Sequence, residues 1–102
     1  MGSRVDFEWD PEKDKANHKK HGLAFSNAAG IFADSNMMTI YDPEHSSEED
    51  RYVSIGRNLK GLVLVVCHTY RESEETETIR IISARRADKD EEMIYYGETK
   101  DK

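Results

Sequence analysis

Residues 45–85 hold the side-chain types that acid–base chemistry at a phosphate requires. Cleavage of RNA without a metal needs a base that removes the 2′-hydroxyl proton and an acid that protonates the leaving 5′-oxygen. It also needs cations against the charge that grows on the phosphoryl oxygens. Histidine titrates near neutral pH, and arginine offers a planar, permanently charged fork of donors. The candidates in or beside the expected strands are His45, Glu49, Arg51, His68, Arg71, Arg80 and Arg85.

The basic residues are gathered in two segments, although the formal net charge is −6. Residues 51–71 and 79–87 contain no acid, and their basic residues are Arg51, Arg57, Lys60, Arg71, Arg80, Arg85 and Arg86. A sheet built from these segments would carry a positive patch on a negative molecule, as phosphate binding requires. Surface arginines paired with acids of neighbouring turns would give the same pattern. Charge alone therefore leaves both interpretations open.

The histidines do not form a metal-ligand pattern. They are His18, His21, His45 and His68. The first two are three residues apart, but Lys19 and Lys20 lie between them and would repel a cation. A catalytic zinc normally takes three protein ligands, which these histidines do not supply. The glycines of the sequence form no phosphate-binding loop either. We therefore expect neither a metal nor another cofactor.

Helix signals dominate the first third of the chain. A short strand is expected at residues 7–9, before a helix that Asp10 caps and Pro11 begins. This helix should end at about His21, because Gly22 can adopt the left-handed conformation after it. A second, shorter helix is expected from a Ser26 cap through residue 32.

The rest of the sequence shows the apolar runs and the alternation of apolar and polar residues that are typical of strands. Strands are expected at residues 37–41, 52–57, 62–70 and 78–84, with a turn at 58–61 and an acidic loop at 72–77. Asp88 is suited to cap a last helix that runs to about Tyr96. The predicted fold class is α+β: two N-terminal helices packed on an antiparallel four-stranded meander sheet, with a C-terminal helix.

Length and composition indicate one domain over residues 1–102. Residues 1–5 are expected to be disordered or the remnant of a tag, and residues 98–102 to form a tail. The sequence has no apolar run long enough to cross a membrane. A single cysteine, Cys67, cannot form an internal disulfide, which favours a reducing compartment, and we expect a cytoplasmic protein.

Strand alternation assigns some candidates to a face. If Ile79 and Ile81 face the core, Arg80 lies on the uncovered face of the sheet. His68 shares a face with Leu64 and Val66, so a core-edge histidine bonded to the backbone is an equally good interpretation. A solvated turn would likewise account for Glu49 and Arg51. A domain that binds a phosphate ligand without cleaving RNA would show the same residues.

The order of motifs resembles the BrnT family of ribonuclease toxins from type II toxin–antitoxin systems. The resemblance covers nearly the whole chain from residue 7 to about residue 96. It rests on Phe7-Glu8-Trp9-Asp10, on Asn17 to Gly22, on Phe25, Ala28, Phe32 and Asp34, on Asp42 with His45 to Arg51, on Ile55-Gly56, on Val65-Val66 with His68 to Arg71, and on Ile79 to Arg85.

The resemblance implies a RelE-like fold, translation arrest by RNA cleavage, and neutralisation by a BrnA-like antitoxin with a ribbon-helix-helix DNA-binding part. In such pairs the complex represses its own operon, so operator DNA would be contacted only through the antitoxin. No contact with a membrane is expected.

The leading hypothesis is a metal-independent endoribonuclease. His45 or Glu49 would transfer protons, and which group acts as base and which as acid stays open. Arg51, Arg80 and Arg85 would stabilise the phosphate. The expected RNA contacts are Lys20, His21, His68, Arg71 and Arg86.

Two alternatives compete with it. The acidic segment 72–77, Glu92 and the net charge favour a catalytically weakened toxin homologue that acts as an antitoxin-binding module and operon co-repressor. A housekeeping phosphate-ligand domain without an antitoxin is the third interpretation, and an adjacent gene for a ribbon-helix-helix protein would count against it.

Overall fold

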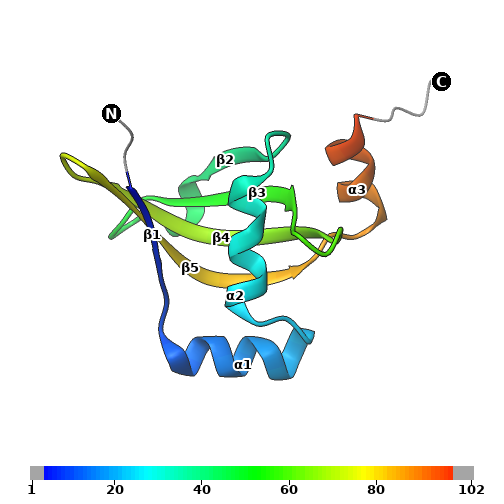
Figure 1. Cartoon of the computed structure of the whole chain (residues 1–102), viewed down its shortest axis with the longest axis horizontal. Helices are drawn as coiled ribbons and strands as arrows, with labels where there is room; N and C mark the ends of the chain where they lie inside the picture. The colour runs from blue at the N-terminus through cyan, green and yellow to red at the C-terminus, as the bar shows by residue number, and fades with distance from the viewer. Residues whose placement is uncertain (1–3, 98–102) are drawn as a thin grey trace.

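A computed structural model describes residues 4–97, which form a five-stranded mixed sheet with three α-helices and two 3₁₀ segments (Figure 1). The strands are β1 (Arg4–Glu8), β2 (Met38–Asp42), β3 (Arg51–Arg57), β4 (Val63–Glu72) and β5 (Thr76–Arg86). The helices are α1 (Pro11–His21), α2 (Phe25–Ala28) and α3 (Lys89–Tyr96), and the 3₁₀ segments are η1 (Ala29–Ala33) and η2 (Pro43–His45). The expectations for residues 1–3 and for the 98–102 tail lie outside the described residues.

The sheet has the order β1-β5-β4-β3-β2. Strands β2 to β5 form the predicted antiparallel meander. The expected four-stranded, RelE-like sheet is nevertheless wrong, because β1 joins it as a fifth strand, parallel to β5. Arg4 pairs with Thr76 and Glu8 with Arg80, so Arg4 and Val5 belong to the sheet rather than to a disordered end. Strand β5 begins at Thr76, two residues earlier than predicted, and its edge away from β4 pairs with β1.

The acidic segment 72–77 forms a hairpin end rather than a loop. Strand β4 continues to Glu72 and β5 starts at Thr76, and the backbone N–H of Ser73 donates to the Thr76 carbonyl at 2.8 Å. The hairpin projects from one end of the molecule, away from the helices (Figure 1). Its acids therefore do not overhang the middle of the sheet.

Helix α1 begins and ends as predicted. The Asp10 carboxylate accepts a hydrogen bond from the Glu12 N–H at 2.9 Å, and Gly22 adopts a left-handed conformation with φ of +71°. The second helix differs from the prediction, because Ser26 makes no capping bond and α-helix gives way to 3₁₀ structure after Ala28. Instead, the Asp14 carboxylate of α1 accepts the Phe25 N–H at 2.8 Å, and α2 begins two residues earlier than predicted, with Ala24 at its N-cap.

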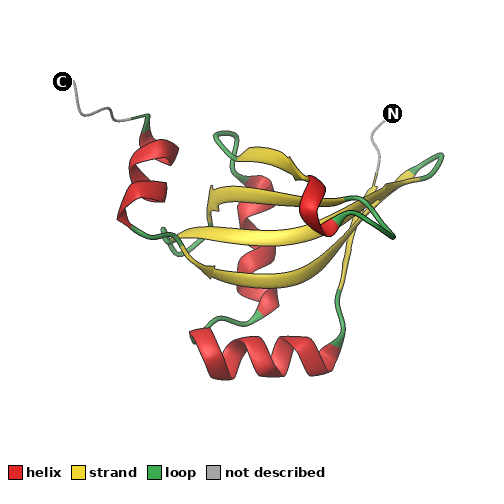
Figure 2. Cartoon of the chain, turned by 180° about the vertical axis from the view of Figure 1, so that it is seen from behind, coloured by secondary structure: helices red, strands yellow, loops and turns green. Residues whose placement is uncertain are grey.

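Helix α2 and segment η1 cover one face of the sheet (Figure 1). The core between them consists of Leu23, Phe25, Ala28, Ile31, Leu64, Val66, Ile79, Ile81 and Ala84. Seen from the other side, the strands lie in front of α2 (Figure 2). The helical segment that lies in front of the sheet in this view is η2, near one end of the strands. We call this second face the open face. The alternation predicted for β5 is confirmed, because Ile79 and Ile81 are buried in the core and Arg80 is not.

Helix α3 lies beside Arg57, the last residue of β3, and is fixed by polar contacts. The Tyr95 hydroxyl donates to the Asp34 carboxylate at 2.5 Å. Asp88 caps α3 as predicted, and Glu91 completes the capping box by accepting the Asp88 N–H at 2.9 Å.

Candidate functional site

A row of polar side chains crosses the open face in register. Asp42 on β2 pairs with Arg51 on β3, which pairs with Thr69 on β4. Thr69 also pairs with Arg80 on β5, which in turn pairs with Glu8 on β1. Paired residues of neighbouring strands project to the same face of a sheet. The row therefore places one arginine on each side of Thr69 and one acid at each end.

Arg71 lies two residues beyond Thr69 on the same face of β4 and joins the arginines of the row. Its guanidinium is 3.8 Å from the Glu49 carboxylate and 3.9 Å from that of Glu8, which also accepts a hydrogen bond from Arg80 at 3.2 Å. Arg71 and Arg80 remain 64% and 40% exposed. Exposed ion pairs of this kind contribute only about 0–1 kcal/mol each, so an anionic ligand can displace them.

His45 stands at the Asp42 end of the row. Its Nδ1 lies 2.8 Å from the Asp42 carboxylate, and the imidazole is 62% exposed. The loop is held in place by Ser46, whose hydroxyl donates to the Asp42 carbonyl at 2.6 Å and accepts the Arg51 N–H at 2.9 Å. A carboxylate on Nδ1 fixes the ring and directs Nε2 to a ligand.

Glu49 belongs to the same neighbourhood. It lines a shallow pocket of about 490 Å³ together with His45 and Arg51. Glu49 and Arg51, for which a solvated turn was the alternative interpretation, thus lie beside His45 at the Asp42 end of the row.

His68 lies on the opposite face and is only 3% exposed. Its Nδ1 is 3.1 Å from the Thr69 carbonyl oxygen, which can only accept a hydrogen bond, so Nδ1 carries the proton. Nε2 therefore accepts a hydrogen bond from the Ser54 hydroxyl at 2.8 Å. Burial lowers the pKa of His68 and keeps the ring neutral. The imidazole packs on Phe32 and Tyr52 and lines an apolar groove of about 430 Å³. This geometry matches the core-edge interpretation, and the structure does not bring His68 to the row.

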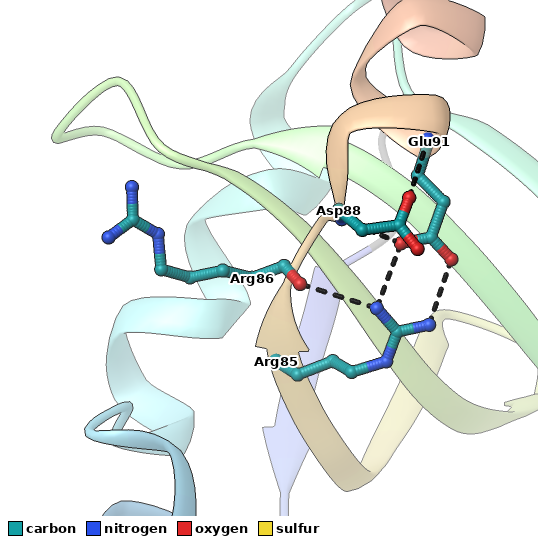
Figure 3. Close-up of polar contacts among 4 residues, drawn as sticks. All are labelled: Arg85, Arg86, Asp88 and Glu91. Carbon is teal, nitrogen blue, oxygen red and sulfur yellow. Dashed lines mark hydrogen bonds and ion pairs between the residues drawn. The ribbon is translucent and has the colours of Figure 1, made fainter.

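Arg85 is on the open face but apart from the row, because it pairs with Val65, four residues from Thr69 along β4. That separation is about 13 Å at the usual rise per residue. Its guanidinium makes two hydrogen bonds of 2.8 Å to the Glu91 carboxylate, while Arg86 points away from it (Figure 3). His21 lines a small pocket with Arg85, and Lys20 is exposed near the end of α1.

The Arg85–Glu91 pair predicts a stability change in acid. Hydrogen bonds from Arg85 are the largest cause that lowers the pKa of Glu91, from 4.5 to about 2. A carboxyl whose pKa is lower in the folded state stabilises the fold above pH 4.5 and loses that contribution as the pH falls towards 2. We expect Glu91→Gln to lower the melting temperature at pH 6 and to approach the wild type near pH 2. Glu92→Gln is the matched control, and a Glu91→Gln deficit that is equal at both pH values would contradict the expectation.

Two acids of the row, Asp42 and Glu8, were not among the predicted site residues, although the motifs of the family resemblance include both. The position of Asp42, three residues before His45, was a usable signal. The position of Glu8 beside Arg80 depends on the parallel pairing of β1 with β5, which no local sequence pattern predicts.

Among residues 4–97, no three histidine, cysteine, aspartate or glutamate side chains are grouped so that they could hold a metal ion. No helix of the same segment is long and apolar enough to cross a membrane.

Comparison with known proteins assigns this architecture to a class. Residues 9–91 match a family described as "Ribonuclease toxin, BrnT, of type II toxin-antitoxin system", so the class of protein is a toxin of this kind of system. The match spans most of the chain. The chain belongs to the BrnT family, which confirms the resemblance seen in the sequence.

A solved structure shows the same fold. The crystal structure of the Brucella abortus ribonuclease toxin BrnT is similar with a TM-score of 0.59 at 20% sequence identity. The alignment covers 85% of this chain and 100% of that chain. No curated protein matches the sequence.

Proposed function

We propose that this chain is a metal-independent endoribonuclease that acts in the cytoplasm, arrests translation, and is neutralised by a BrnA-like ribbon-helix-helix antitoxin. The observation that carries the catalytic part is the row on the open face, where Arg51 and Arg80 flank Thr69 and the Asp42–His45 pair stands at one end. The family supports an antitoxin and an RNA substrate. Operator DNA would be reached only through the antitoxin.

The scissile phosphodiester would lie across β4 between Arg51 and Arg80. Guanidinium groups donate two parallel hydrogen bonds to phosphate oxygens, so each arginine would stabilise the charge that develops there. Arg71 would contact the same phosphate from the next position on β4. Binding replaces the ion pairs that Glu8 makes with Arg71 and Arg80.

His45 suits proton transfer better than Glu49 in this geometry. Nε2 would take the 2′-hydroxyl proton while Asp42 accepts the Nδ1–H and stabilises the imidazolium that forms. Attack of the 2′-oxygen gives a cyclic phosphate and releases the 5′-oxygen as an alcohol, with its proton supplied by water. Glu49, 3.8 Å from Arg71, would mainly hold that guanidinium in place.

Arg85, Lys20 and His21 would guide the RNA rather than act at the scissile bond. Arg85 lies about 13 Å from Thr69 along the open face, His21 lines a pocket with it, and Lys20 is next to His21 in α1. The proposal gives Arg86 and His68 no contact with the scissile phosphate, because Arg86 pairs with the core residue Leu64 on the opposite face and His68 is buried there.

The test is cleavage of single-stranded RNA by the purified chain in EDTA. Arg80→Ala is expected to lower the rate about ten- to hundredfold, because it removes a charged hydrogen bond to the phosphate. Arg86→Ala is the matched control and should cleave like the wild type. An inactive wild-type chain, or an Arg80→Ala chain of undiminished activity, would contradict the proposal.

A second candidate is a weakened toxin homologue that serves as an antitoxin-binding module and operon co-repressor. The observation that favours it is the presence of two carboxylates, Glu8 and Glu49, against Arg71 and Arg80. Expression of the chain alone in bacteria separates the two functions. Growth arrest supports the ribonuclease, and normal growth supports the module.

A further inference from the structure

Thr69 has a buried hydroxyl that the fold does not use. The residue is 1% exposed, and within residues 4–97 its Oγ1 is the buried side-chain polar atom without a hydrogen-bond partner. Burial of an unpartnered hydroxyl costs stability, and such atoms are rare in folded proteins. A specific reason for this hydroxyl is therefore required.

Packing does not supply that reason. Thr69 is in β4, whose other buried positions include Val63, Val65 and Val66. Valine has nearly the shape of threonine and the same preference for strands, and it carries no polar atom. A valine at position 69 would fill the same space without leaving a hydroxyl unsatisfied.

The position of Thr69 indicates a ligand. It alternates with His68 and Tyr70, so its side chain is on the open face, and it is paired with Arg51 on one side and Arg80 on the other. Neighbouring strands are about 4.8 Å apart, which places the two arginine backbones about 10 Å apart with Thr69 midway. One phosphate with a guanidinium on each side fits this span.

We infer that the Thr69 hydroxyl is a phosphate-binding donor, which gives its proton in a hydrogen bond to a phosphate oxygen held between Arg51 and Arg80. Oγ1 becomes accessible to the anion when the Arg80 side chain leaves Glu8, an exposed contact of 3.2 Å, and turns towards the phosphate. The inference rests on the proposed function in naming that anion as the scissile phosphate of RNA. It assigns Oγ1 a contact that the protein alone does not satisfy.

The experiment compares the wild type with Thr69→Val and Thr69→Ser. Each chain is titrated with inorganic phosphate while the backbone amide resonances of Arg51, Thr69 and Arg80 are followed, and its melting temperature is measured without phosphate. Thr69→Val is expected to melt at or above the wild-type temperature, because an unsatisfied buried hydroxyl is gone. Its phosphate affinity is expected to fall about tenfold, since one hydrogen bond to a charged group is lost. Thr69→Ser keeps the donor and should bind phosphate within about twofold of the wild type.

Opposite effects on stability and on phosphate affinity are the signature, because a purely structural threonine would not produce them. Unchanged phosphate affinity in Thr69→Val overturns the inference, as does an equal loss in Thr69→Ser or a wild type that does not bind phosphate at these strands. Single-stranded RNA is then tested in parallel. If phosphate binding behaves as expected but RNA is not cleaved, the proposed function fails and the Thr69 contact stands.

Discussion

Replacement of His45 by glutamine is expected to lower the rate of RNA cleavage by about 10²- to 10⁴-fold, the usual contribution of a positioned acid–base group. Glutamine keeps a polar side chain of similar reach but cannot take up a proton. The imidazole is 62% exposed, so the free energy of unfolding should change by no more than about 0.5 kcal/mol. Single-turnover cleavage and urea unfolding measure the two quantities.

The loss should fall on kcat rather than on KM. The arginines that would bind the phosphate are on β3 and β5, whereas His45 is in η2, so substrate binding is kept. Asp42→Asn is expected to show a smaller loss of the same kind, because it keeps the ring but removes the carboxylate 2.8 Å from Nδ1.

His18→Gln provides the matched control, since His18 is an exposed histidine of α1. It should cleave RNA at the wild-type rate. Equal activities of His45→Gln and His18→Gln would remove His45 from the mechanism and leave the carboxylates of the pocket, Glu48 and Glu49, as the candidates for proton transfer.

Local signals were enough to predict the elements that carry the site. The Asp10 cap and Gly22 fixed the two ends of α1, and the alternation of Ile79, Arg80 and Ile81 placed the arginine on the open face. These predictions succeed because they depend on the conformational preferences of neighbouring residues.

Features set by distant residues could not be predicted in this way. The pairing of Glu8 with Arg80 joins segments about seventy residues apart, and nothing near either residue specifies a parallel partner. Arg85 was misjudged for a different reason: Glu91 is only six residues away, but their pairing depends on how α3 folds back after the end of β5. His68 was the reverse case, since alternation placed it correctly on the Leu64 and Val66 face but could not show how closely Phe32 would cover it.

Helix α1 shows a further limit of pattern reading. Its only buried residue is Asn17, so no apolar face indicates how it is attached. The Asn17 amide donates to the Leu23 carbonyl at 3.0 Å and to the Ala84 carbonyl at 2.9 Å, and its oxygen accepts the Ala84 N–H at 3.1 Å. Strand β1 pairs with β5 only as far as Arg80. Beyond that point the Asn17 amide takes the place of a neighbouring strand at the edge of β5.

Asn17→Ala is therefore expected to lower the free energy of unfolding by about 3 kcal/mol, because three hydrogen bonds are lost and buried backbone groups of Leu23 and Ala84 stay unpaired. Urea unfolding measures the change. Asn27→Ala is the matched control, since Asn27 is exposed on α2, and it should stay within about 0.5 kcal/mol of the wild type. Asn17→Asp should be destabilised as well, because a carboxylate would face two carbonyl oxygens. An Asn17→Ala chain as stable as Asn27→Ala would show that α1 is held to β5 by other contacts.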